Sequence, residues 1–143
     1  MFSRSNIDKR YHHHNKRKYA LKVHIILVTK YREKLLINTF ADDLEQRILD
    51  ISNHHGYEII AVETGGDHIH FLLSYDTTDR ICDIVKLIKQ ETTCYLWKKY
   101  SPFLSTQYRK KRILWSDGYF VCSIGEVSSA TIQRYIENQG QST

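Results

Sequence analysis

The chain has 143 residues, of which 41% are hydrophobic and 26% charged, with six glycines and one proline. This composition is typical of a globular protein with a single core, and it excludes collagen-like, coiled-coil and wholly disordered chains. No run approaches the roughly 18 consecutive apolar residues of a membrane helix, and no apolar segment typical of a secretion signal follows the N-terminus. We therefore expect a soluble, cytoplasmic protein without a membrane partner. Three cysteines without CxxC spacing indicate reduced thiols rather than a disulfide framework or a zinc ribbon.

The net charge of +5 is unevenly distributed. Residues 1–34 contain ten Lys or Arg and two acidic residues. Residues 98–112 contain six Lys or Arg and no acidic residue, so the rest of the chain has more acidic than basic residues. Basic segments on an acidic body favour a polyanionic partner, and the tyrosines among these cations suit stacking on unpaired bases. The alternative is a solvated tail and a solvated loop. We expect contacts with a nucleic acid from Lys30, Arg32, Lys34, Arg109, Lys110, Lys111 and Arg112.

Residues 1–17 show no apolar periodicity and are predicted to form a flexible basic arm ahead of a single domain over residues 18–143. The arm contains His12, His13 and His14. Adjacent residues of a flexible arm cannot all face one metal ion, so we interpret this run as part of a solvated arm.

The first half of the domain predicts a strand, a helix and a hairpin. An apolar run over Tyr19–Thr29 is typical of a central strand, and apolar residues at helical spacing predict a helix over Thr39–His55, capped by Asn38 or Thr39 and ended by Gly56. The segments Tyr57–Thr64 and His68–Tyr75 predict two strands joined by a tight turn at Gly65-Gly66.

The second half predicts a helix, a strand and a final helix. The first helix is expected to start with Thr77 or Thr78 as its cap and to run to about Lys99, where Pro102 breaks it before a basic loop through Arg112. A strand over Gly118–Gly125 and a helix that is capped by Ser128 or Ser129 and stops at Gly140 complete the chain.

This order predicts an α+β, ferredoxin-like βαββαβ fold with an additional C-terminal helix. The first two helices would cover one face of a four-stranded antiparallel sheet. The other face needs a cover, which could be the last helix or a nucleic acid.

Two features of that second face could carry chemistry. Alternation puts His68 and His70 on one face of their strand, about 7 Å apart, where two imidazoles can converge on one metal ion. In the last helix, Tyr135 and Gln139 lie one turn apart along the stripe that docks the helix. Two histidines and an amide oxygen could hold a divalent cation that neutralises a phosphodiester while a phenolate attacks it. The alternative is an ordinary core tyrosine and two structural histidines.

These segments resemble the single-tyrosine HUH transposases of small bacterial and archaeal insertion sequences, the IS200-like family. The resemblance spans about residues 19–140 in the family's order. It rests on VHIILVTKYREKLL, on GGDHIHFLLS with its His-hydrophobic-His signature, on WSDGYFVCSIG, and on the helix with Tyr135 and Gln139.

The resemblance implies that Tyr135 attacks single-stranded DNA to give a 5′-phosphotyrosine and a free 3′-OH. It implies that His68, His70 and Gln139 hold Mg²⁺ or Mn²⁺, and that a homodimer processes two hairpin ends of a mobile element. It assigns no role to the N-terminal arm. Glu63 and Asp67, close to the histidines, are candidates for metal or proton handling or are ordinary turn carboxylates.

Other functions stay open at this point. A host-domesticated relative acting on repetitive palindromes would share the chemistry, as would a rolling-circle-type nicking protein, although nicking proteins usually carry extra domains. An RNA-binding βαββαβ module would require exposed aromatic rings on the central strands, which the segment Tyr19–Ile26 does not supply as a pair at its centre.

Overall fold

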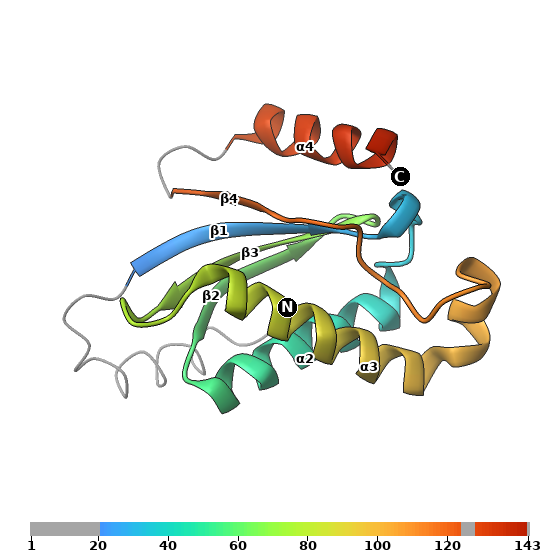
Figure 1. Cartoon of the computed structure of the whole chain (residues 1–143), viewed down its shortest axis with the longest axis horizontal. Helices are drawn as coiled ribbons and strands as arrows, with labels where there is room; N and C mark the ends of the chain where they lie inside the picture. Colours follow the sequence, from blue (N-terminus) through green and yellow to red (C-terminus); the bar gives the residue numbers. More distant parts are fainter. Residues whose placement is uncertain (1–20, 124–127, 143) are drawn as a thin grey trace.

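The computed structural model describes residues 21–123 and 128–142. It contains one antiparallel sheet in the order β2-β3-β1-β4, with α2 and α3 on one side and α4 on the other (Figure 1). The expected ferredoxin-like order is confirmed, and of the two covers considered for the second face, α4 contacts it through Ile136, which packs with Ile26 and Val28. The bounds are β1 Leu21–Val28, η1 Lys30–Arg32, α2 Asn38–His55, β2 Glu58–Thr64, β3 His68–Tyr75, α3 Ile81–Gln107, β4 Phe120–Cys122 and α4 Ser129–Ser142.

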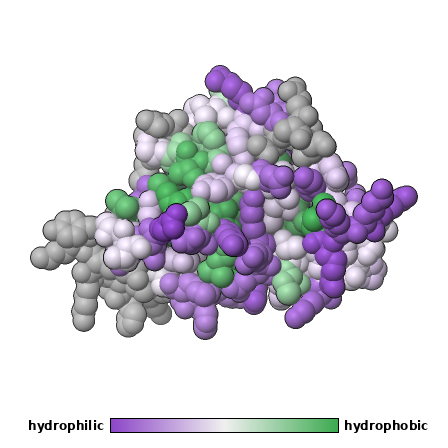
Figure 2. All heavy atoms as spheres, viewed as in Figure 1, coloured by the Kyte–Doolittle hydropathy of each residue, from purple (hydrophilic) through white to green (hydrophobic). Residues whose placement is uncertain are grey.

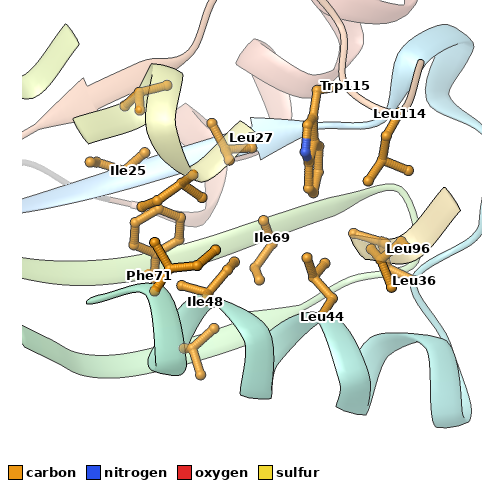
Figure 3. Packing of buried hydrophobic residues seen from close by; sticks show 14 of the residues in the cluster. Ile25, Leu27, Leu36, Leu44, Ile48, Ile69, Phe71, Leu96, Leu114 and Trp115 are labelled. Atoms are coloured by element: carbon orange, nitrogen blue, oxygen red, sulfur yellow. The ribbon is translucent and has the colours of Figure 1, made fainter. Parts of the chain in front are cut away.

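Strand β1 is central, pairing with β3 on one side and β4 on the other. Its side chains alternate between two separate apolar clusters. Ile25 and Leu27 face the main core under α2 and α3, where they meet Ile69 and Phe71 of β3 (Figure 3). Ile26 and Val28 face the opposite side and pack with Ile136 of α4. Burial on both faces explains why the strand is an unbroken apolar run.

Helix α2 ends as predicted but begins differently. Gly56 adopts the left-handed conformation (φ 82°) that terminates the helix. The predicted cap at Asn38 or Thr39 is wrong, because Ile37 occupies the N-cap position without a side-chain cap and Asn38 has a φ of 51°. Here the chain direction is fixed by the preceding backbone pairing of Leu36 with Gly66 rather than by a capping side chain.

Helix α3 differs from the prediction at both ends. Its N-cap is Arg80, whereas Thr77 and Thr78 lie in a turn closed by the Asp79 N–H on the Asp76 carbonyl. Pro102 does not end the helix: the backbone kinks at Tyr100 (φ −120°, ψ 29°) and continues to Gln107. Proline is tolerated in the first turn after such a kink because that position needs no N–H donor.

The C-terminal elements follow the predicted order with changed bounds. Strand β4 is confined to Phe120–Cys122, within the predicted segment, and residues 124–127 lie outside the described part of the chain. The Ser128 hydroxyl accepts the Thr131 N–H at 3.1 Å, which is the expected capping bond. Helix α4 passes through Gly140 to Ser142, so the predicted stop at Gly140 is wrong. The N-terminal arm, residues 1–17, lies outside the described residues.

Candidate active site

Strand β3 places His68 and His70 on the face of the sheet that α4 covers. In the antiparallel register His68 pairs with Val28 and His70 pairs with Ile26, and paired residues share a face. Val28 and Ile26 are the two β1 side chains that pack with α4. The predicted placement of the two histidines is therefore confirmed, and both are half-buried.

The imidazole of His68 is held by a neighbouring carboxylate. Its Nδ1 lies 3.0 Å from Oδ1 of Asp67, and Oδ2 of Asp67 lies 3.3 Å from Nε of Arg32. Asp67 is only 7% exposed, so this carboxylate is a buried group between two partners rather than a solvated turn residue.

The imidazole of His70 is bound to a third histidine. Nε2 of His70 lies 2.7 Å from Nδ1 of His24 in β1, with ring centroids 4.8 Å apart. Burial lowers the pKa of His24. The pKa of His70 is lowered mainly by burial and then by the charge of His24, whereas the carboxylate of Glu63, which pairs with His70 from β2, raises it. Both imidazoles are therefore neutral at pH 7, the form in which histidine binds a metal ion.

Tyr135 of α4 lies against the same sheet face. Its ring centroid is 5.2 Å from that of Phe120, which pairs with Ile26, and its side chain packs against the cluster of Ile26, Val28 and Ile136. The Tyr135 hydroxyl is buried and has no hydrogen-bond partner within the described residues. Burial raises the pKa of Tyr135 to about 12. A buried hydroxyl without a partner is uncommon, and a reactive role is one explanation for it.

The remaining predicted ligand is only partly described. Gln139 lies four residues after Tyr135 in α4, but its side chain is outside the described part of the structure. Among the described residues, no three His, Cys, Asp or Glu side chains are gathered closely enough to hold a metal ion. Two histidines on one strand face fit a divalent cation that takes further ligands from outside this set.

The two basic segments, far apart in the sequence, meet in the structure. The Lys30 N–H donates to the Leu114 carbonyl at 2.8 Å, and the Tyr108 hydroxyl donates to the Lys30 carbonyl at 2.8 Å. The exposed ring of Tyr31 lies 6.2 Å from that of Tyr108. Hydrophilic side chains project from the end of the molecule where α3 and the following loop lie (Figure 2). The exposed ring of Tyr31 therefore lies where the two basic segments meet, and η1 also contacts α4.

Sequence reasoning did not identify the roles of His24 and Arg32. His24 lies in an apolar strand, two residues before Ile26. Alternation along a strand places His24 on the same face as Ile26 and Val28, so the sequence could have placed His24 on the face of the other two histidines. Arg32, predicted to contact DNA, also directs its Nε to Oδ2 of Asp67, with its side chain 35% exposed. That contact depends on tertiary structure and has no signature in the sequence.

Comparison with known proteins decides the family. A model described as "Transposase IS200 like" matches residues 17–139. The chain belongs to this IS200-like transposase family. The ISDra2 transposase TnpA of Deinococcus radiodurans is 33% identical over 121 residues, covering 85% of each chain. The family resemblance expected from the sequence motifs is confirmed, and a member of this family is a DNA-cleaving and strand-transferring enzyme.

Solved structures agree with the IS200-like assignment. A crystal structure of a Deinococcus radiodurans R1 protein assigned as a transposase superposes with a TM-score of 0.77 and 36% identity, over 85% of this chain and 92% of that one. A REP-associated tyrosine transposase bound to a REP hairpin has a TM-score of 0.53 at 14% identity, over 85% and 67%. This second likeness concerns the fold alone. No helix among the described residues is both long and apolar enough to cross a membrane.

Proposed function

We propose that this chain is a metal-dependent transposase that cleaves and rejoins the single-stranded ends of an insertion sequence through a 5′-phosphotyrosine intermediate. The observation that carries the proposal is the buried, unpartnered hydroxyl of Tyr135 on the sheet face that also bears His68 and His70. A phenol oxygen on the same sheet face as two histidines is suited to nucleophilic attack on a phosphodiester, and no hydrogen bond among the described residues gives it a structural role.

In the proposed reaction, Oη of Tyr135 forms a bond to phosphorus and the bond from phosphorus to the 3′ oxygen breaks. The phenol proton is lost, the departing 3′ oxygen gains a proton, and the 5′ phosphate remains on the tyrosine. The phosphotyrosine retains the energy of the phosphodiester, so the 3′-OH of another strand can reverse the step and rejoin DNA without a nucleotide cofactor.

His68, His70 and Gln139 are proposed to hold the cation, Mg²⁺ or Mn²⁺. When bound, it stabilises phenolate and phosphate charge, which matters because the pKa of Tyr135 is raised to about 12 by burial. The protein contributes the neutral state of His70 through burial and through His24. It also contributes the apolar contacts that fix the ring of Tyr135.

The basic surface is proposed to bind the DNA strand. Its cations are Lys30, Arg32 and Lys34 near η1 and Arg109, Lys110, Lys111 and Arg112 after α3. The exposed ring of Tyr31 lies among them, with Lys30 Nζ 5.6 Å from its centroid. Cations that track phosphates and rings that stack on bases are the usual elements of single-strand recognition. Hairpin ends of a mobile element are the proposed substrate.

The test is covalent trapping. Labelled single-stranded element ends are incubated with the full chain and Mn²⁺ or Mg²⁺, and protein-DNA adducts are resolved under denaturing conditions. Wild-type protein should form a metal-dependent adduct, Tyr135→Phe should form none while still binding the hairpin, and His68→Ala and His70→Ala should lose metal-dependent adduct. Gln139→Ala should lose less, because both imidazoles remain to hold the cation. An adduct formed equally by Tyr135→Phe would contradict the proposal.

The active unit is proposed to be a homodimer. The edge position of β4 in the sheet order β2-β3-β1-β4 supports this, since an outer strand can pair with a second copy. Inactive His68→Ala and inactive Tyr135→Phe subunits are mixed and allowed to exchange. Recovered cleavage would mean that a tyrosine helix serves the partner's histidines. Absence of recovery in a dimer proven by light scattering would place Tyr135 at the histidines of its own chain, as α4 lies in this structure.

A further inference from the structure

In the turn before β3, the ring of His68 lies directly against the backbone of Gly65. A Cβ placed on Gly65 would collide with Cε1 of His68 and would lie 2.6 Å from Nε2 and 2.9 Å from Nδ1, closer than side chains pack. The backbone of Gly65 itself is in a region that alanine adopts readily, because only Gly66 of this pair has a positive φ (84°). A glycine is therefore needed at position 65 because the imidazole leaves no room for a side chain, and not because the turn requires a positive φ there.

The carboxylate that meets this imidazole is itself fixed. Asp67 accepts the Thr29 N–H at 2.9 Å and the Thr29 hydroxyl at 3.2 Å on its backbone carbonyl, and it donates its own N–H to the Gly65 carbonyl at 3.0 Å. These bonds hold the backbone of Asp67 against β1. Its side chain is 10% exposed, and its Oδ1 lies 3.0 Å from Nδ1 of His68.

Arg32 holds the second oxygen of the same carboxylate. Its Nε lies 3.3 Å from Oδ2 of Asp67. Arg32 and the preceding Tyr31 have φ values of 53° and 61°, a left-handed conformation that costs energy in residues other than glycine. This pair of unfavourable residues turns the chain at the end of β1 so that Arg32 reaches Asp67. Strain retained at such a point is typical of a functional constraint.

We infer that Gly65, Asp67 and Arg32 are positioning residues that hold the imidazole of His68 in one tautomer, with Nδ1–H donated to Asp67 and the Nε2 lone pair available to a cation. A carboxylate acceptor at Nδ1 fixes both the tautomer and the ring direction of a metal-binding histidine and increases its basicity. Without that acceptor the imidazole also populates the Nε2–H tautomer, which has no lone pair at Nε2. The inference rests on the proposed function only in taking His68 as a metal ligand.

The first measurement reads the tautomer directly, without metal or DNA. Long-range ¹H–¹⁵N spectra of the metal-free full chain at pH 8 distinguish protonated from unprotonated ring nitrogens, and the His68→Gln variant assigns the signals. Wild-type His68 should show a protonated Nδ1 and an unprotonated Nε2. A predominant Nε2–H tautomer in the wild type would overturn the inference.

The second measurement is Mn²⁺ affinity by calorimetry, and it uses matched pairs of variants. Asp67→Ala and Gly65→Ala should weaken binding by about 10- to 100-fold, the usual effect of removing a residue that orients a ligand. Gly66→Ala, one position along, strains the turn without touching the ring and should keep the wild-type affinity and tautomer. Arg32→Gln should weaken Mn²⁺ binding, whereas Lys30→Gln, which removes a neighbouring charge without a contact to Asp67, should not.

The outcomes separate this inference from the proposed function. If Asp67→Ala does not fold, Gly65→Ala and Arg32→Gln supply the same comparison. Unchanged Mn²⁺ affinity and tautomer in the folded variants would overturn the inference even where the wild type forms the adduct with DNA. The expected tautomer and affinity pattern in a protein that forms no adduct would support the inference while contradicting the proposed function.

Discussion

His24 of β1 and His70 of β3 join their rings through a single hydrogen bond, with 2.7 Å between Nδ1 of His24 and Nε2 of His70. Two ring nitrogens at this distance share one proton, so the pair is stable only while at least one imidazole is neutral. Protonating both would place two positive charges on one half-buried sheet face. This relationship ties the stability of the metal-free protein to pH.

Because of this histidine pair, we expect the metal-free protein to lose stability in mild acid. Burial lowers the pKa of both histidines below the value of 6.5 that they have when unfolded, so the unfolded chain binds more protons. Stability is therefore complete above pH 6.5 and falls as the pH drops through the lowered pKa values. The free energy of unfolding, measured with urea at pH 7.5 and pH 5.5, should differ less in His24→Gln than in the wild type. His54→Gln, a change at an exposed histidine of α2, is the control and should keep the full difference.

Tyr135→Phe should not destabilise the fold. Its hydroxyl is buried without a partner among the described residues, so removing it relieves a desolvation cost, and we expect unchanged stability or a gain of up to about 1 kcal/mol. Tyr108→Phe is the matched control, because that hydroxyl donates to the Lys30 carbonyl at 2.8 Å and its loss should cost about 0.5–1.5 kcal/mol. Urea denaturation measures both. A Tyr135→Phe variant that lost more stability than Tyr108→Phe would show that Tyr135 has a structural hydrogen bond.

The phenol of Tyr135 should ionise only in strong alkali in the metal-free protein. Burial raises its pKa from 10.0 to about 12, so the folded state favours the neutral phenol, and the stability that this contributes is present below pH 10 and lost between pH 10 and about 12. The absorbance of phenolate near 295 nm, taken as the wild type minus Tyr135→Phe, isolates this group from the other tyrosines. A difference spectrum that titrates near pH 10 would contradict the buried environment.

Neutralising Arg109, Lys110, Lys111 and Arg112 to glutamine should weaken binding to all single-stranded sequences to a similar degree. Cations that neutralise phosphates release counterions, so the slope of log affinity against log salt should fall by about 0.7 for each phosphate that the variant no longer neutralises. Fluorescence anisotropy with two unrelated oligonucleotides at several salt concentrations measures both effects. Lys86→Gln, an exposed cation of α3 outside this cluster, is the control. Weakening confined to one sequence would indicate base recognition instead.

The sequence predicted the fold well where a periodic pattern determined the structure. His68–Tyr75 is bounded as predicted because its alternation is regular and a glycine turn precedes it. The ends of α2 and α3 could not be predicted from capping residues. At Ile37 and Arg80 no side chain caps the helix, and long-range backbone pairing or the preceding turn sets the start.

The site was predictable as far as residues close in sequence defined it. The histidine pair on one strand face, and Tyr135 on the helix that covers that face, follow from periodicity and from the need to cover the sheet. The partners of the two imidazoles did not follow. His24 and Arg32 reach them across the sheet and across a left-handed turn, and neither the register nor that turn can be read from one sequence.

Three hydrogen bonds between backbone atoms join the end of β1 to the histidine turn and the basic loop. The Thr29 N–H donates to the Asp67 carbonyl, the Lys30 N–H to the Leu114 carbonyl, and the Ser116 N–H to the Val28 carbonyl. Backbone donors are present whatever side chain stands at a position, proline excepted. Substitutions at Arg109–Arg112 can therefore change how tightly the proposed surface holds DNA without disturbing these three bonds. The basic loop is therefore free to diverge between related chains while the histidine turn stays in place.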